Sequence, residues 1–453
     1  MRIHINNIMR ILRLMLFVSP PISNCSCMRT SCLDDIFHEI QLFKSHISCK
    51  LIDKWAFSVY TVGMRYIKRV LDISHDLERK SQFLFGPRQT GKTSWIREEL
   101  DGVSYRFNLL DKKLVKALQD DPALFAGMLR REGIDSGLVV VDEIQKLPFL
   151  LDEVHNLIET TDIRFLLTGS SARRLREQGT NLLGDRAGWK EMYPLVWPEI
   201  KDDAPELDSV FKSGLIPAMY LSDDPDSDLF DYVQLYLNEE IQAEGLVRNL
   251  PSFERFLEVA ALSNSEMLNY ENISKDVGVS RSAVISWFQI LYDTLIAFEV
   301  PAYTKTKKRK AYASSKFYMF DIGVIRHLLG FEKIEAGSTE YGKFFETYMA
   351  MEMRAYIGYR SRPKLNITPL GYWRSLSGFE VDFILMEKVA IETKTTRRHT
   401  ARDLKGLKAL KEEGLFSRYI LVCNEDYAQT TEDDIEIVPW RQFLDELWAG
   451  KII

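Results

Sequence analysis

The sequence has few cysteines outside its first fifty residues and no long apolar run in its interior. Of the 5 cysteines only Cys423 lies beyond residue 49, so we expect the main body to be a reduced, cytoplasmic protein. Without an interior run of about eighteen apolar residues, we expect no membrane span beyond the N-terminus. The net charge of -6 excludes a surface that is basic throughout, but it leaves a local basic patch open.

The first 63 residues differ from the rest of the chain. Basic residues precede the apolar run Leu14–Val18, which resembles a weak signal peptide. The other four cysteines also lie here, with a spacing that fits no standard zinc pattern and no accompanying histidine pair: Cys25, Cys27, Cys32 and Cys49. We interpret the segment as sequence upstream of a start assigned too early, and Met64 as the natural beginning.

Three short apolar segments predict the strands of a buried parallel sheet. They are Ser81–Phe85, Leu138–Val141 and Asp162–Thr168, and helical patterns such as Leu150–Glu159 lie between them. Strands that alternate with helices predict a doubly wound α/β domain. A chain of 453 residues is long enough for about three domains.

A glycine-rich loop follows the first of these strands. It reads Gly86-Pro87-Arg88-Gln89-Thr90-Gly91-Lys92-Thr93, and a helix is expected over 93–100. The glycines let the backbone N–H groups face phosphates, to which the start of the helix is also attractive. Lys92 would bridge the β- and γ-phosphates, and the Thr93 hydroxyl would bind Mg²⁺. The loop therefore predicts binding of ATP with Mg²⁺.

Acidic residues end the second apolar strand. Asp142 would hold Mg²⁺ through water, and Glu143 would polarise the attacking water. A pair of solvated acids is the alternative, but the upstream loop favours catalysis. At the end of the third strand, Ser170, or else Thr168, would touch the γ-phosphate or the lytic water; a plain polar turn is the alternative. Arg186 is a candidate arginine finger for a neighbouring subunit; a surface salt bridge is its alternative.

These motifs resemble those of prokaryotic AAA+-type ATPases in which a poorly characterised C-terminal domain follows the P-loop domain. The resemblance rests on the loop together with Val141–Pro148, Leu167–Ser171 and Pro194–Glu199, and it covers the chain from Met64 onward. We expect five segments: an N-terminal extension, 1–63; an AAA+-type ATPase domain, 64–200; a helical lid, 201–265; a winged helix, 266–335; and a nuclease-like domain, 336–453.

Two acids and a lysine are predicted to meet in the last domain. Glu392 and Lys394 are two apart on a strand and share a face, and a hairpin through 387–388 would bring Asp382 beside them. The set resembles the core of PD-(D/E)xK nucleases, which implies that Asp382 and Glu392, with Glu346 on the first helix, hold Mg²⁺ or Mn²⁺. The proline that often precedes the aspartate is replaced by Val381. The alternative is a salt-bridged sheet without chemistry.

Residues 273–287 predict two helices around a glycine turn, followed by a hairpin over 300–318 with a basic tip, Lys305–Lys310. Such a winged helix could track DNA phosphates with its tip while Arg281, Ser282 and Ser286 approach a groove. A solvated hairpin tip, or docking of a protein, is the alternative. Two functions follow: an ATPase that licenses a nuclease, or an ATP-dependent binding switch with a catalytically silent C-terminal domain. An arginine finger would also require a homo-oligomer.

Overall fold

The computed structural model describes residues 65–171, 173, 183–237, 250–360 and 367–453. The expectations for 1–63, with their four cysteines, and for the start at Met64 lie outside these residues. The fold described below is that of the unit Tyr66–Ile453.

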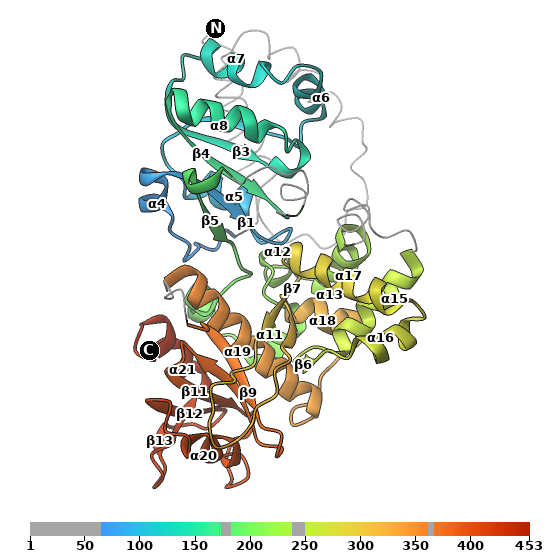
Figure 1. Ribbon diagram of the computed structural model, residues 1–453, viewed down its shortest axis with the longest axis vertical. Coiled ribbons are helices and arrows are strands. Elements are labelled where there is room, and N and C mark those ends of the chain that lie inside the picture. The colour runs from blue at the N-terminus through green and yellow to red at the C-terminus, as the bar shows by residue number, and fades with distance from the viewer. Residues whose placement is uncertain (1–64, 172, 174–182, 238–249, 361–366) are drawn as a thin grey trace, which may run out of the picture. The chain divides into compact units, whose positions relative to one another are not determined.

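The first domain is built on a parallel sheet (Figure 1). Its five strands stand in the order β2-β3-β4-β1-β5, and every neighbouring pair is parallel. Their bounds are Ser81–Phe85 for β1, Val103–Asn108 for β2, Ser136–Asp142 for β3, Asp162–Gly169 for β4 and Ala187–Glu191 for β5. The predicted α/β domain is confirmed, and β4 lies between β1 and β3, so that its end stands between the P-loop and Asp142.

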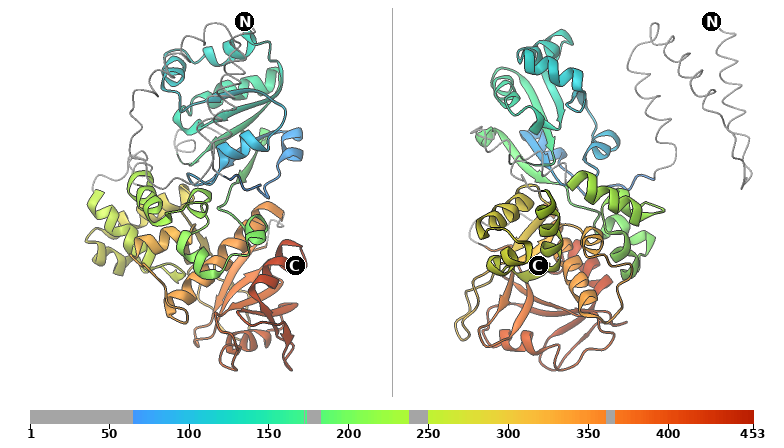
Figure 2. Two further views of the ribbon diagram at one scale, coloured as in Figure 1. Left: turned by 180° about the vertical axis from the view of Figure 1, so that it is seen from behind. Right: turned by 90° about the vertical axis from the view of Figure 1, so that its right-hand side faces the viewer.

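Alternation along the strands sends side chains to two apolar layers. Val139 and Val141 pack with α6 (Lys112–Asp120), α7 (Leu124–Arg131) and α8 (Leu150–Thr160). Val140 instead packs with α4 (Ser74–Arg79) and α5 (Lys92–Glu98). Figures 1 and 2 show α8 and α5 on opposite faces of the sheet. Burial of both faces explains why the central strands read as continuous apolar runs.

Helices fill the middle of the chain. They are α10 (Trp197–Ile200), η3 (Lys201–Asp203), α11 (Leu207–Ser213), α12 (Pro217–Tyr220), α13 (Pro225–Asp231), the π-helix η4 (Tyr232–Leu237) and α15 (Leu250–Leu262). The two helices predicted around a glycine are α16 (Tyr270–Val277) and α17 (Arg281–Asp293). Gly278, with φ 79°, ends the first, and the Ser280 side chain caps the second.

A three-stranded sheet in the order β6-β8-β7 follows these helices. Strand β7 (Ala297–Val300) pairs antiparallel with β8 (Lys316–Met319), and β6 is Glu266–Met267. The residues between β7 and β8 do not form the free hairpin tip that we expected over 300–318. Isolated bridges join Ala302 to Tyr372 and Ala311 to Ser375, so this connection lies along the last domain.

Acidic residues of the last domain explain why the basic connection lies there. Lys305 pairs with Glu387 at 2.7 Å, and Arg309 pairs with Glu412 at 2.7 Å. The Glu413 carboxylate also accepts the backbone N–H groups of 307, 308 and 309. Two of the predicted phosphate-tracking cations, Lys305 and Arg309, are therefore paired with acids of the same chain.

The last domain is a mixed sheet between helices. Its six strands stand in the order β13-β14-β12-β11-β10-β9, with bounds Leu370–Arg374 (β9), Glu380–Leu385 (β10), Val389–Thr393 (β11), Arg418–Cys423 (β12), Gln429–Thr430 (β13) and Glu436–Pro439 (β14). The long helix α19 (Thr339–Arg360) and α21 (Trp440–Trp448) pack in one apolar cluster, and α20 (Lys405–Lys411) packs in another. Helix α18 (Ile322–Leu328) precedes them. Among the helices that the structure describes, none combines the length and apolarity needed to cross a bilayer.

Candidate functional site

The predicted P-loop is a tight turn between β1 and α5. Gln89 and Gly91 have positive φ, 62° and 93°, which curls the backbone. The buried Lys92 amino group lies inside the loop and donates to the carbonyls of Gly86 at 2.6 Å and Pro87 at 2.9 Å. A Cβ on Gly86 would stand 2.4 Å from the Met192 carbonyl oxygen, so the first position requires glycine.

Asp142 is the centre of a hydrogen-bonded cluster at the carboxyl edge of the sheet. Its Oδ2 accepts from the Thr93 hydroxyl at 3.1 Å and from Arg106 at 2.7 Å, and its Oδ1 accepts from the Thr168 hydroxyl at 2.5 Å. Asp142 is 1% exposed, so these partners stabilise a buried charge. Neighbouring hydroxyl and carboxylate oxygens are ligands that Mg²⁺ prefers, so Thr93 and Asp142 fit the predicted ion.

Sequence reasoning missed Gln145, which connects two predicted catalytic residues. Its amide donates to Glu143 Oε2 at 2.5 Å and to the Ser170 hydroxyl at 3.0 Å. Glu143, which follows β3 directly, is half-buried and adopts a left-handed backbone conformation with φ 65°. The structure thus brings Glu143, Ser170, Thr168 and Asp142 together. Gln145 lies within the motif Val141–Pro148, but that motif indicated no role for its side chain.

Arg186 lies elsewhere. Arg186 directly precedes β5, whereas the P-loop follows the parallel strand β1. Arg186 therefore lies at the N-terminal ends of the strands, and the P-loop lies at their C-terminal ends. Its guanidinium pairs with Glu159 at the end of α8, and both side chains are about half exposed. This pair lowers the pKa of Glu159, through the hydrogen bond and the charge of Arg186. Arg186 is not brought to the P-loop of its own chain.

A second group missed from the sequence is Arg69, which joins the P-loop to the segment after β5. We call residues 191–199 the strap. The Arg69 guanidinium donates to the carbonyl of Thr90 at 2.5 Å, to those of Tyr193 and Pro194, and to Glu199 at 3.0 Å. Arg69 is 5% exposed. One buried cation therefore holds the P-loop backbone against the strap.

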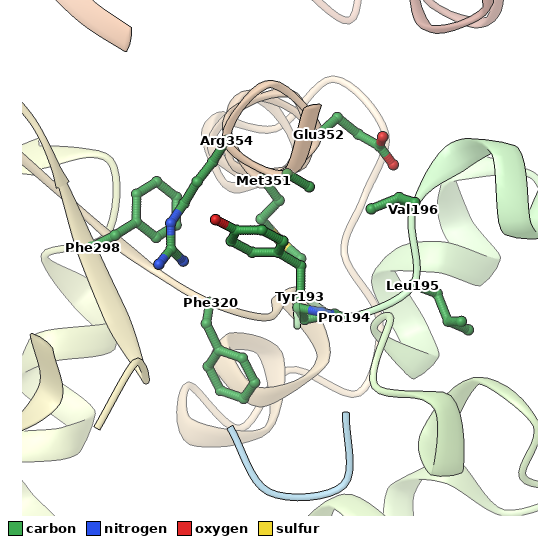
Figure 3. A pocket seen from close by; sticks show the side chains of 10 residues that line it. Tyr193, Pro194, Leu195, Val196, Phe298, Phe320, Met351, Glu352 and Arg354 are labelled. Carbon is green, nitrogen blue, oxygen red and sulfur yellow. The ribbon is translucent and has the colours of Figure 1, made fainter. Parts of the chain in front are cut away.

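The other side of the strap packs on α19 (Figure 3). Arg354 stands between the rings of Tyr193 and Phe298, at 5.0 and 4.6 Å from their centroids, and pairs with Glu191 at 2.8 Å. The Tyr193 and Trp197 N–H groups donate to Tyr359 and Glu352 of the same helix. A continuous chain of contacts runs from the P-loop to α19.

The last domain brings its predicted acids and lysine together. Strands β10 and β11 form the expected antiparallel pair, with Phe383 opposite Ile391. The Asp382 carboxylate accepts from the Thr393 N–H and hydroxyl, both at 2.8 Å, and Lys394 pairs with Glu392 at 2.6 Å. Asp382 and Glu392 are 6% and 7% exposed.

The sequence did not predict that a second lysine enters this cluster. Lys316, at the start of β8, is 4% exposed, and its amino group lies 2.7 Å from Glu380 and 3.0 Å from Glu346. It is also 4.0 Å from Asp382 Oδ1. Within the described ranges, no three His, Cys, Asp or Glu side chains are arranged to hold a metal ion. The residues as arranged do not fit the divalent cation predicted at Asp382, Glu392 and Glu346, whose metal role stays a prediction.

Burial and neighbouring charges shift the pKa values in this cluster. Loss of solvent, followed by the charge of Asp382, raises the pKa of Glu392 to about 8, although Lys394 and Lys316 oppose the shift. Burial also raises the pKa of Glu346. Burial alone would lower the pKa of Lys316, but Glu346 and the other nearby acidic groups raise it overall.

The sheet order, the P-loop and the Asp142 cluster together define the first domain as a nucleotide-binding P-loop domain of the ATPase class. In agreement, a family model described as an AAA domain matches residues 78–201. Two domains of unknown function match later parts of the chain, DUF8612 at 205–335 and DUF4143 at 341–443.

Relatives along most of the chain are uncharacterized proteins. One from Mycobacterium tuberculosis is 22% identical over 424 residues, covering 91% of this chain and 90% of the relative. One from Methanocaldococcus jannaschii is 24% identical over 416 residues, covering 80% and 84%.

Among solved structures, the chain is weakly similar to the Aeropyrum pernix ORC2 protein in its ADP form, with TM-score 0.30 and 13% identity over 55% of this chain and 88% of that one. The Aeropyrum pernix ORC1 protein in complex with DNA gives TM-score 0.23 and 13% identity over 58% and 93%. The assignment of the ATPase class rests on the sheet, the P-loop cluster and the AAA match.

Proposed function

We propose that the chain is a cytoplasmic, Mg²⁺-dependent ATPase whose nucleotide cycle acts on a winged helix and a nuclease-like C-terminal domain. The observation that carries this proposal is the cluster in which Asp142 joins Thr93 of the P-loop to Thr168 of β4. When bound, Mg²⁺ supplies positive charge that neutralises the phosphates and the developing charge of the transition state.

The chain's own groups divide the remaining work. Thr93 and Asp142 would hold the cation, and Lys92 would leave the loop carbonyls for the phosphates. Glu143 would accept a proton from the attacking water, and Gln145 would hold Glu143 and Ser170 in position. Arg186, at the far edge of the sheet, would act only on the nucleotide of a second copy in an oligomer.

Phosphate release from Mg-ATP tests the ATPase proposal. We expect Glu143→Gln to slow turnover about 100-fold or more while ATP binding is kept, because a general base contributes roughly 10²–10⁴-fold. Lys92→Ala should lose binding as well. The matched control is Glu159→Gln, which changes an exposed acid at the other end of the sheet from the P-loop. In a monomer this variant should leave the rate of ATP hydrolysis unchanged. Equal turnover in wild type and Glu143→Gln would refute the assignment.

The exposed face of α17 is the favoured contact for DNA or a protein partner. Arg281, Ser282 and Ser286 are all exposed there, whereas Lys305 and Arg309 are paired with acids of the last domain. Recognition through a helix face, with less help from the wing, is therefore the form of binding that we propose.

Two functions remain for the nuclease-like domain: cleavage of nucleic acid, or binding without catalysis. Cleavage predicts that Mn²⁺-dependent nicking of DNA is lost in Lys394→Ala and Asp382→Ala. A binding switch predicts no nicking, and a nucleotide-dependent affinity that survives Lys394→Ala but not Lys92→Ala. The buried lysine in the acid cluster favours the switch, because it neutralises charge that a metal would otherwise neutralise.

A further inference from the structure

One of the two cations of the C-terminal acid cluster comes from a neighbouring segment. Lys316 belongs to β8, which pairs with β6 and β7, whereas the acids that it contacts lie on α19 and β10. The family match to the first segment ends at 335, and the match to the second begins at 341. An ammonium group from one domain thus lies among carboxylates of the next.

The contacts of β8 are more extensive than one ion pair. Residues two apart on a strand share a face, and Tyr318 accordingly donates its hydroxyl to Glu346 at 2.6 Å. The Lys316 amino group also lies 5.3 Å from the centre of the Tyr372 ring. The cluster consists of two lysines, Lys316 and Lys394, and of four acids, Glu346, Glu380, Asp382 and Glu392. The two lysines carry together the same positive charge as one divalent ion.

One oxygen of the cluster has no hydrogen-bond donor among the residues that the structure describes. Glu392 is 7% exposed, its Oε1 pairs with Lys394, and the buried oxygen in question is its Oε2. An oxygen in this state is costly to bury unless a proton or a cation satisfies it.

We propose that Lys316 occupies the cation position of this cluster and blocks divalent cations, so that β8 must withdraw before Asp382 and Glu392 can bind one. Lys316 is then an autoinhibitory counter-ion, and β8 connects the helix pair α16–α17 to the C-terminal site. The inference rests on the C-terminal part of the proposed function and is independent of the ATPase.

Binding of Mn²⁺ to the full chain without nucleotide tests the inference, for example by the electron paramagnetic resonance of free Mn²⁺. We expect Lys316→Met to gain a site about tenfold tighter than any in wild type, and the gain to disappear in Lys316→Met/Glu392→Gln. Because a buried charge is removed, Lys316→Met/Glu380→Gln is a second, charge-balanced variant. The control is Lys343→Met on α19, which removes the partly exposed partner of Glu266 and should change nothing.

Two results would overturn the inference. One is Mn²⁺ binding by wild type that Asp382→Asn abolishes, because the cluster would then accept metal with Lys316 in place. The other is the absence of a gain in both Lys316 variants. If a Lys316 variant binds Mn²⁺ and cuts no DNA, the inference stands and the nuclease part of the proposed function fails.

Discussion

Glu352 is a carboxylate with good hydrogen bonds and almost no contact with solvent. It accepts from the Trp197 N–H at 2.8 Å and from the Trp448 indole at 2.7 Å, and it is 1% exposed. Loss of solvent raises its pKa to about 8, although both hydrogen bonds act in the opposite direction. The folded protein therefore binds this proton at pH values where the unfolded chain has released it.

The sign of the pH effect follows from that difference. Between about pH 4.5 and 8 the folded state holds more protons, so the free energy of unfolding falls as pH rises. One such group contributes a slope of at most about 1.4 kcal/mol per pH unit. We expect Glu352→Gln to reduce the loss of Tm between pH 5 and 8, measured by thermal unfolding.

The control for this prediction is Glu340→Gln, which changes an exposed acid in the first turn of the same helix. Part of the pH dependence should remain in Glu352→Gln, because burial raises the pKa of Glu392 to about 8 as well. An unchanged difference in Tm would show that Glu352 is ionised in the folded protein throughout this range.

At the scale of elements, the strap connects β5 to α19 and is anchored by one arginine. Arg69 is buried, and removing one partner of a buried ion pair costs about 3–5 kcal/mol. We expect Arg69→Met to lose stability on that scale and to bind ATP more weakly, because the Thr90 carbonyl loses its donor. Chemical denaturation and ATP titration measure the two effects.

The matched control is Arg97→Met on α5, whose ion pair with Glu98 has both side chains about 40% exposed. Exposed pairs contribute about 0–1 kcal/mol, so this variant should be close to wild type in both measurements. Equal losses in the two variants would contradict the anchoring role of Arg69.

The elements that could be predicted from the sequence are those whose own residue pattern indicates the secondary structure. Strands β1, β3 and β4 are apolar runs, since both of their faces are buried. The edge strands β2 and β5 escaped prediction because residues such as Arg106 and Lys190 keep them partly exposed. The proximity of Asp382, Glu392 and Lys394 could be predicted because it depends only on side-chain alternation along a strand and on a short hairpin between neighbouring strands.

Two of the missed residues, Lys316 and Arg69, have roles that depend on distant partners. Lys316 contacts acids that lie up to 66 positions later in the chain and in a different family segment. Its positive charge gives no indication that its side chain is buried. Arg69 contacts carbonyls 124 and 125 positions away. The basic connection at 305–310 was mistaken for a free tip because the acids that neutralise it follow much later in the chain.

At the scale of the whole unit, one apolar cluster extends through the segments after the ATPase sheet. Trp197 of the strap, Phe256 of α15, Phe317 of β8 and Phe345 of α19 all belong to it. Interiors packed in this way transmit displacement rather than absorb it. A nucleotide-dependent shift at Arg69 would therefore reach α19, which carries Glu346, and β8, which carries Lys316.

Amide hydrogen exchange of the strap tests this transmission most directly. The experiment compares Glu143→Gln, which should hold ATP without turnover, with and without saturating Mg-ATP. We predict that exchange at Tyr193, Leu195 and Trp197 slows on binding, because their N–H groups donate to Tyr359, Leu215 and Glu352. The same amides should not respond in the Arg69→Met background. Identical exchange in the bound and free protein, with nucleotide binding verified, would show that the P-loop does not act on the rest of the chain through the strap.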